Sequence, residues 1–245
     1  MKKQIPNLIT LCNLLCGTMA AYAAAIGHLD TAAMLIMAGI VFDFFDGMVA
    51  RMLQVSSPIG RELDSLADVV TSGVAPAVIV YQLFSTEHAI LGVMALLIPA
   101  FSAYRLATFN LDTTQSTSFR GLPTPANALV WAALGLLYSQ SEVAKFTLIP
   151  TETLNNWIFS TPGVIVLALL SFVLDLLMVS NVRMLSLKFH DLRWRNNSSR
   201  YLLLLTSITV ILLMGVLGIA VAILLYVLLS LLTKQTQPAP SETSR

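Results

Sequence analysis

Long apolar runs separated by short polar segments recur from one end of the chain to the other. A helix needs about 20 apolar residues to cross the roughly 30 Å hydrocarbon core of a bilayer, and many of these runs reach that length. The runs predict helices at residues 8–26, 31–53, 60–84, 88–109, 124–140 and 159–182. The final run, residues 201–232, is too long for one untilted span, so it forms either one tilted helix or two helices bent near Gly215 and Gly218.

We favour two helices at this end, so the pattern predicts an all-α, polytopic membrane bundle of roughly seven or eight transmembrane helices. The composition agrees, because 56% of the 245 residues are hydrophobic and only 11% are charged. A net charge of +1 provides no basic surface for a phosphate backbone, which argues against nucleic-acid binding. We expect one membrane-embedded domain at residues 1–234 and a disordered polar tail at residues 235–245.

The basic residues predict the orientation of this bundle. Cytoplasmic segments of membrane proteins are enriched in Lys and Arg. With the N-terminus inside, most of the 14 basic residues fall in inside segments: Lys2, Lys3, Arg51, Arg61, Arg105, Arg120, Arg183, Lys188, Arg193, Arg195 and Arg200. The connection between the second and third predicted helices then faces the cytoplasm. The last five of these residues are expected to form a patch that binds anionic lipids of the inner leaflet.

Four carboxylates interrupt the apolar pattern within residues 41–68. Asp43 and Asp46 are three residues apart, and Asp64 and Asp68 are four apart, so each pair shares one face of a helix. The sequence SSPIG between the pairs breaks the helix. We therefore expect a helical hairpin whose two arms present two carboxylates each to one space.

Four carboxylates in such a setting need a cation, because a buried or membrane-embedded charge is costly unless it is paired or metal-bound. Oxygen ligands favour a hard divalent ion such as Mg²⁺ or Mn²⁺, and four carboxylates suit two ions. The alternative is a set of helix-end carboxylates that cap helices or pair with Arg51 and Arg61.

The complete stretch resembles the signature of the CDP-alcohol phosphotransferases, which are integral membrane enzymes that transfer a substituted phosphate from a CDP-linked donor to an alcohol. The matching residues are Asp43-x2-Asp46-Gly47-x2-Ala50-Arg51-x8-Gly60-x3-Asp64-x3-Asp68. The resemblance implies that the four aspartates hold the metal ions and that Asp68 also acts as the base that deprotonates the acceptor hydroxyl.

The resemblance also implies contacts with the CDP-linked donor. Besides residues of the signature, it includes the family's PNxxT start, which Pro6 to Thr10 match. The implied donor-binding residues are Asn7, Thr10, Gly47, Ala50, Arg51 and Ser57. Two of them have structural alternatives: Ser57 stands where a helix N-cap is expected before Pro58, and Asn7 could cap the first helix.

Three later segments resemble the phosphatidylserine synthase branch of this family: RLATFN at residues 105–110, RGLPTPA at 120–126 and SNVRMLSLK at 180–188. Two departures are Thr108, where arginine is usual, and Asn127, where a small residue is usual. This branch uses CDP-diacylglycerol and L-serine, acts in the cell inner or plasma membrane, and suggests a homodimer. The resemblance therefore implies transfer of a phosphatidyl group to serine by direct in-line attack, with release of CMP.

A serine acceptor needs a cationic group for its carboxylate, and the inside-facing candidates are Arg105, Arg120 and Asn110. Arginines at cytoplasmic helix ends also serve to hold topology and bind lipid phosphates. Other acceptors, glycerol 3-phosphate or inositol, would keep the same chemistry. A divalent-cation transporter is an alternative of a different class, in which the aspartates form a transport site.

Overall fold

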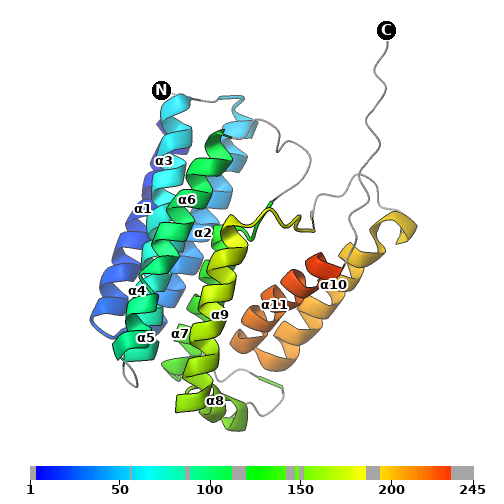
Figure 1. Ribbon diagram of the computed structural model, residues 1–245. Helices are drawn as coiled ribbons and strands as arrows, with labels where there is room; N and C mark the ends of the chain where they lie inside the picture. Colours follow the sequence, from blue (N-terminus) through cyan, green and yellow to red (C-terminus); the bar gives the residue numbers. More distant parts are fainter. Residues whose placement is uncertain are drawn as a thin grey trace.

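The protein is described from a computed structural model, in which every regular element among the described residues is a helix (Figure 1). The structure describes residues 4–55, 57–85, 89–111, 120–141, 147–148, 152–185 and 194–232. The expected tail at 235–245 lies outside these ranges, as do two members of the proposed lipid patch, Lys188 and Arg193.

Two long antiparallel helices and a third span build one side of the bundle. Helix α1 (Gln4–Ala25) packs along α2 (Leu29–Met52). The third span consists of α3 (Pro58–Asp68), a π-helical segment η1 (Val69–Val74) and α4 (Ala75–Ser85), which follow one another without a gap. π-Helical turns insert one extra residue into a helix and often occur at functional sites.

The middle of the chain supplies the core. A helix α5 (Ala89–Met94) and α6 (Leu97–Leu111) together occupy the predicted fourth span, with a short turn between them. Helix α7 (Thr124–Tyr138) lies at the centre, and most of its side chains are buried. Its Trp131 ring packs edge-on against Phe84 of α4, with ring centroids 6.1 Å apart. A short helix α8 (Glu152–Ile158) precedes α9 (Thr161–Val179), which runs beside α6.

The last apolar run forms two helices, α10 (Trp194–Met214) and α11 (Val216–Leu232), which confirms the bend predicted near Gly215. Gly215 has a φ of 57°, a left-handed conformation that glycine adopts without steric cost. The two helices lie side by side, and α11 packs against α7 (Figure 1).

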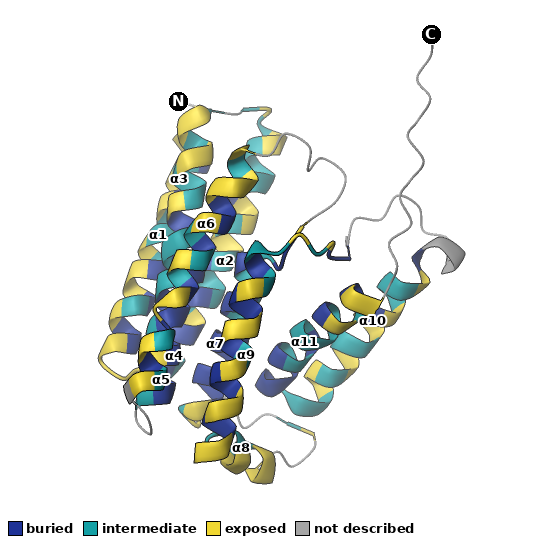
Figure 2. Cartoon of the chain, viewed as in Figure 1, coloured by how far each residue is buried: buried dark blue, intermediate teal, exposed yellow. Residues whose placement is uncertain are grey.

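The outer surface of this bundle is apolar. Six helical spans in the described residues are long and apolar enough to cross a membrane: residues 4–25, 29–52, 58–85, 90–111, 161–179 and 197–214. Large apolar side chains such as Leu15, Leu169 and Leu205 are exposed along them, while α7 is covered (Figure 2). Such a surface is stable in lipid and not in water, so the chain is an integral membrane protein.

Candidate active site

The four aspartates lie on the two helices that the hairpin prediction required. Asp43 and Asp46 are on α2, and Asp64 and Asp68 are on α3, the helix that follows it in the chain. Carboxylate oxygens of Asp43, Asp64 and Asp68 lie within 4.8 Å of one another. Asp68 is buried, and the other two are half-buried. The arms of the hairpin therefore bring three of the four carboxylates into a single cluster.

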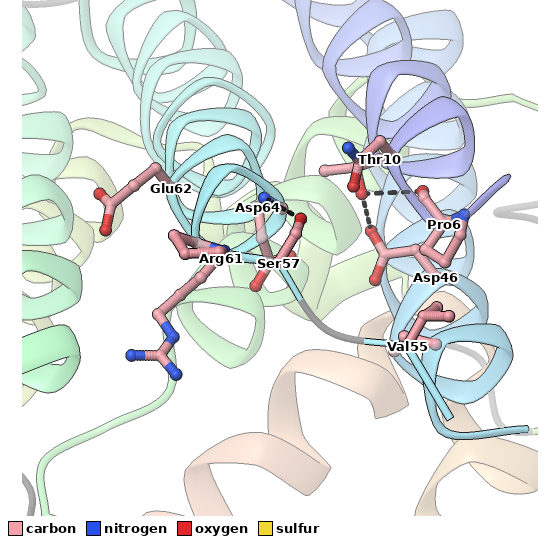
Figure 3. Close-up of a pocket in the computed structure, with 13 residues that line it drawn as sticks. Pro6, Thr10, Asp46, Val55, Ser57, Arg61, Glu62 and Asp64 are labelled. Carbon is pink, nitrogen blue, oxygen red and sulfur yellow. Dashed lines mark hydrogen bonds between the residues drawn. The ribbon is translucent and has the colours of Figure 1, made fainter. Parts of the chain in front are cut away.

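Asp46 is buried and makes a separate contact with α1. The Thr10 hydroxyl oxygen lies 2.5 Å from Asp46 Oδ2 and 3.1 Å from the Pro6 carbonyl oxygen, so it can donate its proton to either (Figure 3). This contact joins the N-terminal helix to α2 at the level of the carboxylates. Thr10 was predicted to bind the donor, and the structure places it against one of the predicted metal ligands.

Asn13, one turn after Thr10 on α1, was not predicted as a site residue. Its side-chain Nδ2 donates a hydrogen bond of 3.3 Å to Asp68 Oδ1, while Thr71 of η1 donates to the Asn13 backbone carbonyl at 3.0 Å. The spacing of Asn7, Thr10 and Asn13, three residues each, was the available signal, because it places all three on one helix face.

The carboxylate cluster fits a divalent cation. Asp64 Oδ1 and Asn13 Oδ1 are buried and have no hydrogen-bond partner in the part of the chain that the structure describes. Buried oxygens without a donor are costly, and three adjacent carboxylates repel one another. Asp43, Asp64 and Asp68 offer the oxygen-only donor set that Mg²⁺ and Mn²⁺ prefer.

A cavity of about 430 Å³ opens beside this cluster, between α1, the end of α2 and the start of α3. Five of the six predicted donor-binding residues line it: Asn7, Thr10, Gly47, Ala50 and Ser57. Asp46 and Asp64 form part of the same wall, so the cavity and the carboxylates are continuous. The sixth residue, Arg51, is exposed and lies next to Gly47. Figure 3 shows that Arg61 and Glu62 extend away from Thr10 and Asp46.

Ser57 is the N-cap of α3, as the structural alternative predicted. It has an extended backbone, and its Oγ accepts a hydrogen bond of 2.9 Å from the Gly60 N–H. A Cβ at Gly60 would lie 2.9 Å from Asn7 Oδ1, so the absence of a side chain at Gly60 leaves room for the Asn7 amide. Asn7 lies inside α1, which begins at Gln4, so its alternative role as a helix cap is wrong.

We expect Ser57→Ala to destabilise the protein by about 1 kcal/mol, because the substitution removes the side-chain oxygen that caps α3. Ser57→Asn should stay close to the unchanged protein, since asparagine is an equally good cap. Thermal unfolding of the purified proteins in detergent would measure both effects. Equal midpoints for Ser57→Ala and the unchanged protein would contradict this prediction.

The three residues predicted to bind serine do not all come together. Arg105 is 9% exposed, and it lines a second cavity of about 50 Å³ together with Arg120. Asn110 instead donates a hydrogen bond of 2.8 Å to Ser65 Oγ, which ties α6 to α3. The structure therefore groups the two arginines and places Asn110 in a helix–helix contact.

The segment RGLPTPA is held against the end of α9. Arg120 forms an isolated antiparallel bridge with Arg183, and the N–H groups of Gly121 and Leu122 donate to the carbonyl oxygens of Val182 and Leu177. These backbone bonds fix the turn before α7 and place Arg120 beside the cavity that Arg105 lines.

Comparisons with known proteins place the sequence in a family of membrane enzymes. The sequence model of the CDP-alcohol phosphatidyltransferase family matches residues 3–159. A Bacillus subtilis protein named CDP-diacylglycerol–serine O-phosphatidyltransferase is 36% identical over 136 residues, which cover 55% of this chain and 77% of that protein. A Helicobacter pylori protein of the same name is 34% identical over 209 residues, 84% of this chain and 80% of its own length. An archaetidylserine synthase from Methanothermobacter thermautotrophicus is 31% identical over 154 residues, 61% of this chain and 66% of its own.

Proposed function

The chain belongs to the CDP-alcohol phosphatidyltransferase family, and we propose that it transfers the phosphatidyl group of CDP-diacylglycerol to the hydroxyl of L-serine. The products would be phosphatidylserine and CMP. The names of the relatives support serine as the acceptor, and the match to the Helicobacter protein covers most of both chains. The observation that carries the proposal is the carboxylate cluster of Asp43, Asp64 and Asp68 beside a cavity large enough for part of a nucleotide.

The donor would occupy the 430 Å³ cavity with its pyrophosphate near the aspartates. The small side chains of Gly47 and Ala50 leave room along α2, and Asn7 supplies an amide on the opposite wall. Arg51, at the edge of this wall, would pair with a donor phosphate through charge-assisted hydrogen bonds. The acyl chains would extend from the cavity into the surrounding lipid.

Asp43, Asp64 and Asp68 would hold a divalent ion, Mg²⁺ or Mn²⁺. We also expect a second ion, and Asp46 would be an additional ligand for it. In this structure the Asp46 carboxylate contacts the Thr10 hydroxyl. When bound, the ions neutralise the pyrophosphate and stabilise the negative charge on the departing CMP.

Asp68 would act as the base. The hydrogen bond from Asn13 fixes its carboxylate, and its other oxygen stays available to accept the proton of the serine hydroxyl. The serine oxygen forms a bond to the phosphorus that carries diacylglycerol, and the bond from that phosphorus to the CMP oxygen breaks. This sequence is a direct, in-line displacement, with no covalent intermediate on the enzyme.

We also propose that the site faces the cytoplasm. The exposed Arg51 and Arg61 lie at the same end of the bundle as the aspartates, and cytoplasmic ends of membrane proteins are rich in such residues. A homodimer is expected from the family resemblance, and the mass of the purified protein in detergent would test it.

The proposal is tested by CMP release from CDP-diacylglycerol with purified protein, Mg²⁺ or Mn²⁺, and one acceptor at a time. Release that requires L-serine is the expected result. Release with glycerol 3-phosphate or inositol, and not with serine, would show that the proposed acceptor is wrong while the proposed type of reaction is right. If the folded protein releases no CMP with any acceptor but moves divalent ions across vesicle membranes, the alternative function of a divalent-cation transporter is favoured.

A further inference from the structure

Two residues of the third span contact a single residue of α1. Asp68 is the last residue of α3, and Thr71 follows three residues later in η1. The Asn13 side chain donates a hydrogen bond of 3.3 Å to Asp68 Oδ1, and the Thr71 hydroxyl donates one of 3.0 Å to the Asn13 backbone carbonyl. Asn13 and Thr71 are fully buried. Asn13 is thus held by its side chain and by its backbone, and both bonds join α1 to the span that carries Asp68.

Thr71 packs between α1 and α2 where each helix has a glycine. A Cβ at Gly17 of α1 would overlap the Thr71 hydroxyl oxygen, and a Cβ at Gly39 of α2 would lie 2.6 Å from the Thr71 methyl carbon. Carbon atoms in ordinary contact are about 3.5 to 4.0 Å apart, so a side chain at either glycine would displace Thr71. The Thr71 side chain therefore lies directly against the backbone of both helices.

The hydrogen bond from Thr71 is additional to the bonds that form α1. Within the helix, the Asn13 carbonyl accepts from the N–H of Gly17, four residues later. A carbonyl oxygen has two lone pairs, so the Thr71 hydroxyl uses the second one. The helix does not need this bond in order to form. Its effect is on position, because it ties one turn of α1 to η1 beside Asp68.

The orientation of the Asn13 amide depends on that position. A Cβ at Gly39 would lie 2.9 Å from Asn13 Oδ1, so the amide oxygen lies toward α2 and the amide nitrogen faces Asp68. An ionised carboxylate only accepts hydrogen bonds, which matches this orientation. Hydrogen bonds from N–H to oxygen are usually about 2.7 to 3.2 Å long. At 3.3 Å, the bond from Asn13 to Asp68 tolerates little further movement of α1.

We propose that Thr71 is a positioning residue for phosphatidyl transfer: by holding Asn13, it keeps the Asp68 carboxylate in the orientation in which its free oxygen meets the acceptor hydroxyl. This inference rests on the proposed function, because it concerns the base of that reaction. The residues that line the 430 Å³ cavity include neither Asn13 nor Thr71. Both residues should therefore affect the chemical step and not the binding of CDP-diacylglycerol.

The test is a double-substitution cycle, with serine-dependent CMP release measured on purified protein at saturating Mn²⁺. Asn13→Ala should lower kcat about tenfold or more, because it removes a hydrogen bond to a charged group. Thr71→Val keeps the shape of the side chain but removes the hydroxyl, and it should lower kcat about fivefold. The protein with both substitutions should have the kcat of Asn13→Ala alone, because Thr71 acts through Asn13.

Two further readouts separate positioning from a purely structural role. Thr71→Ser keeps the hydroxyl and should restore kcat to within about twofold of the unchanged protein. The KM for CDP-diacylglycerol should change by less than about twofold in all these variants, since the bonds at issue act on the base. A purely structural role would lower the unfolding temperature and leave kcat per folded molecule unchanged.

Thr18→Val is the matched control, since the exposed Thr18 hydroxyl donates to the Leu14 carbonyl at 2.9 Å within the same helix α1. It should keep the kcat of the unchanged protein. Thr71→Ala removes the hydroxyl without placing a methyl group against Gly17, and it takes the place of Thr71→Val if that protein does not fold.

The outcomes distinguish this inference from the proposed function. If the unchanged protein releases no CMP with serine, the proposed function is wrong. If it does, an intact kcat in Asn13→Ala or in the folded Thr71 variant that lacks the hydroxyl shows that the role of Thr71 is wrong. The same conclusion follows if the loss of the Thr71 hydroxyl lowers kcat by an equal factor with and without Asn13→Ala, because Thr71 would then act independently of Asn13.

Discussion

Asp68→Asn is expected to reduce serine-dependent CMP release by about 10³-fold or more. Asparagine keeps the shape of the side chain but cannot accept a proton, and general-base catalysis alone contributes about 10² to 10⁴ in rate. The same substitution removes one carboxylate from the metal cluster, which adds to the loss. Initial rates at saturating CDP-diacylglycerol and serine would measure the effect.

Asp175→Asn provides the matched control for this experiment. Asp175 is also a buried aspartate on a membrane-spanning helix, with 1% of its surface exposed, but it lies on α9 near Asn127 and not in the cluster. It should retain the rate of the unchanged protein. An Asp68→Asn protein with more than a tenth of that rate would show that Asp68 is not the base.

Asp64→Asn is expected to make the protein more stable than the unchanged protein without metal and less stable than it with Mn²⁺. Without metal, three carboxylates within 4.8 Å repel one another, so removal of one charge should raise the unfolding temperature. With Mn²⁺ at 100 times its Kd, the unchanged protein gains about 2.7 kcal/mol from binding, and the variant should gain much less. The two unfolding curves should therefore change order when Mn²⁺ is added.

Thermal unfolding in detergent, with EDTA and then with Mn²⁺, would measure this crossing. Asp30→Asn is the control, because Asp30 lies in the first turn of α2 and contacts Thr31 at the opposite end of that helix from the cluster. It should respond to Mn²⁺ like the unchanged protein. Equal stabilisation of the Asp64→Asn protein by Mn²⁺ would contradict a metal site at this cluster.

Most of the helices could be predicted from the sequence, because a helix that crosses a lipid bilayer needs about 20 mostly apolar residues. The bend at Gly215 was predicted correctly, since a run that exceeds one span must bend or tilt. The division of the fourth span into α5 and α6 was missed, because its turn at residues 95–96 lies within an apolar run. The apolar pattern alone does not reveal a local break in a helix when the residues at the break are themselves apolar.

The hairpin of aspartates could be predicted because the spacing within each helix fixes which side chains share a face. The contacts between helices could not. Thr10 with Asp46 and Asn13 with Asp68 are 36 and 55 residues apart, so they depend on how α1 packs on the hairpin. For the same reason, the sequence grouped Asn110 with the arginines, whereas the packing of α6 turns it toward Ser65.

The π-helical segment at Val69–Val74 sets the angle between two parts of one span. Each residue of an α-helix turns the chain by about 100°, so one extra residue rotates everything beyond it by that amount. The face of α3 that carries Asp64 and Asp68 is thereby offset from the face of α4 that packs Ile79 and Phe84 into the core. The irregular turn therefore changes the rotation of the acid-bearing face of α3 relative to the core-facing side of α4 within one membrane span.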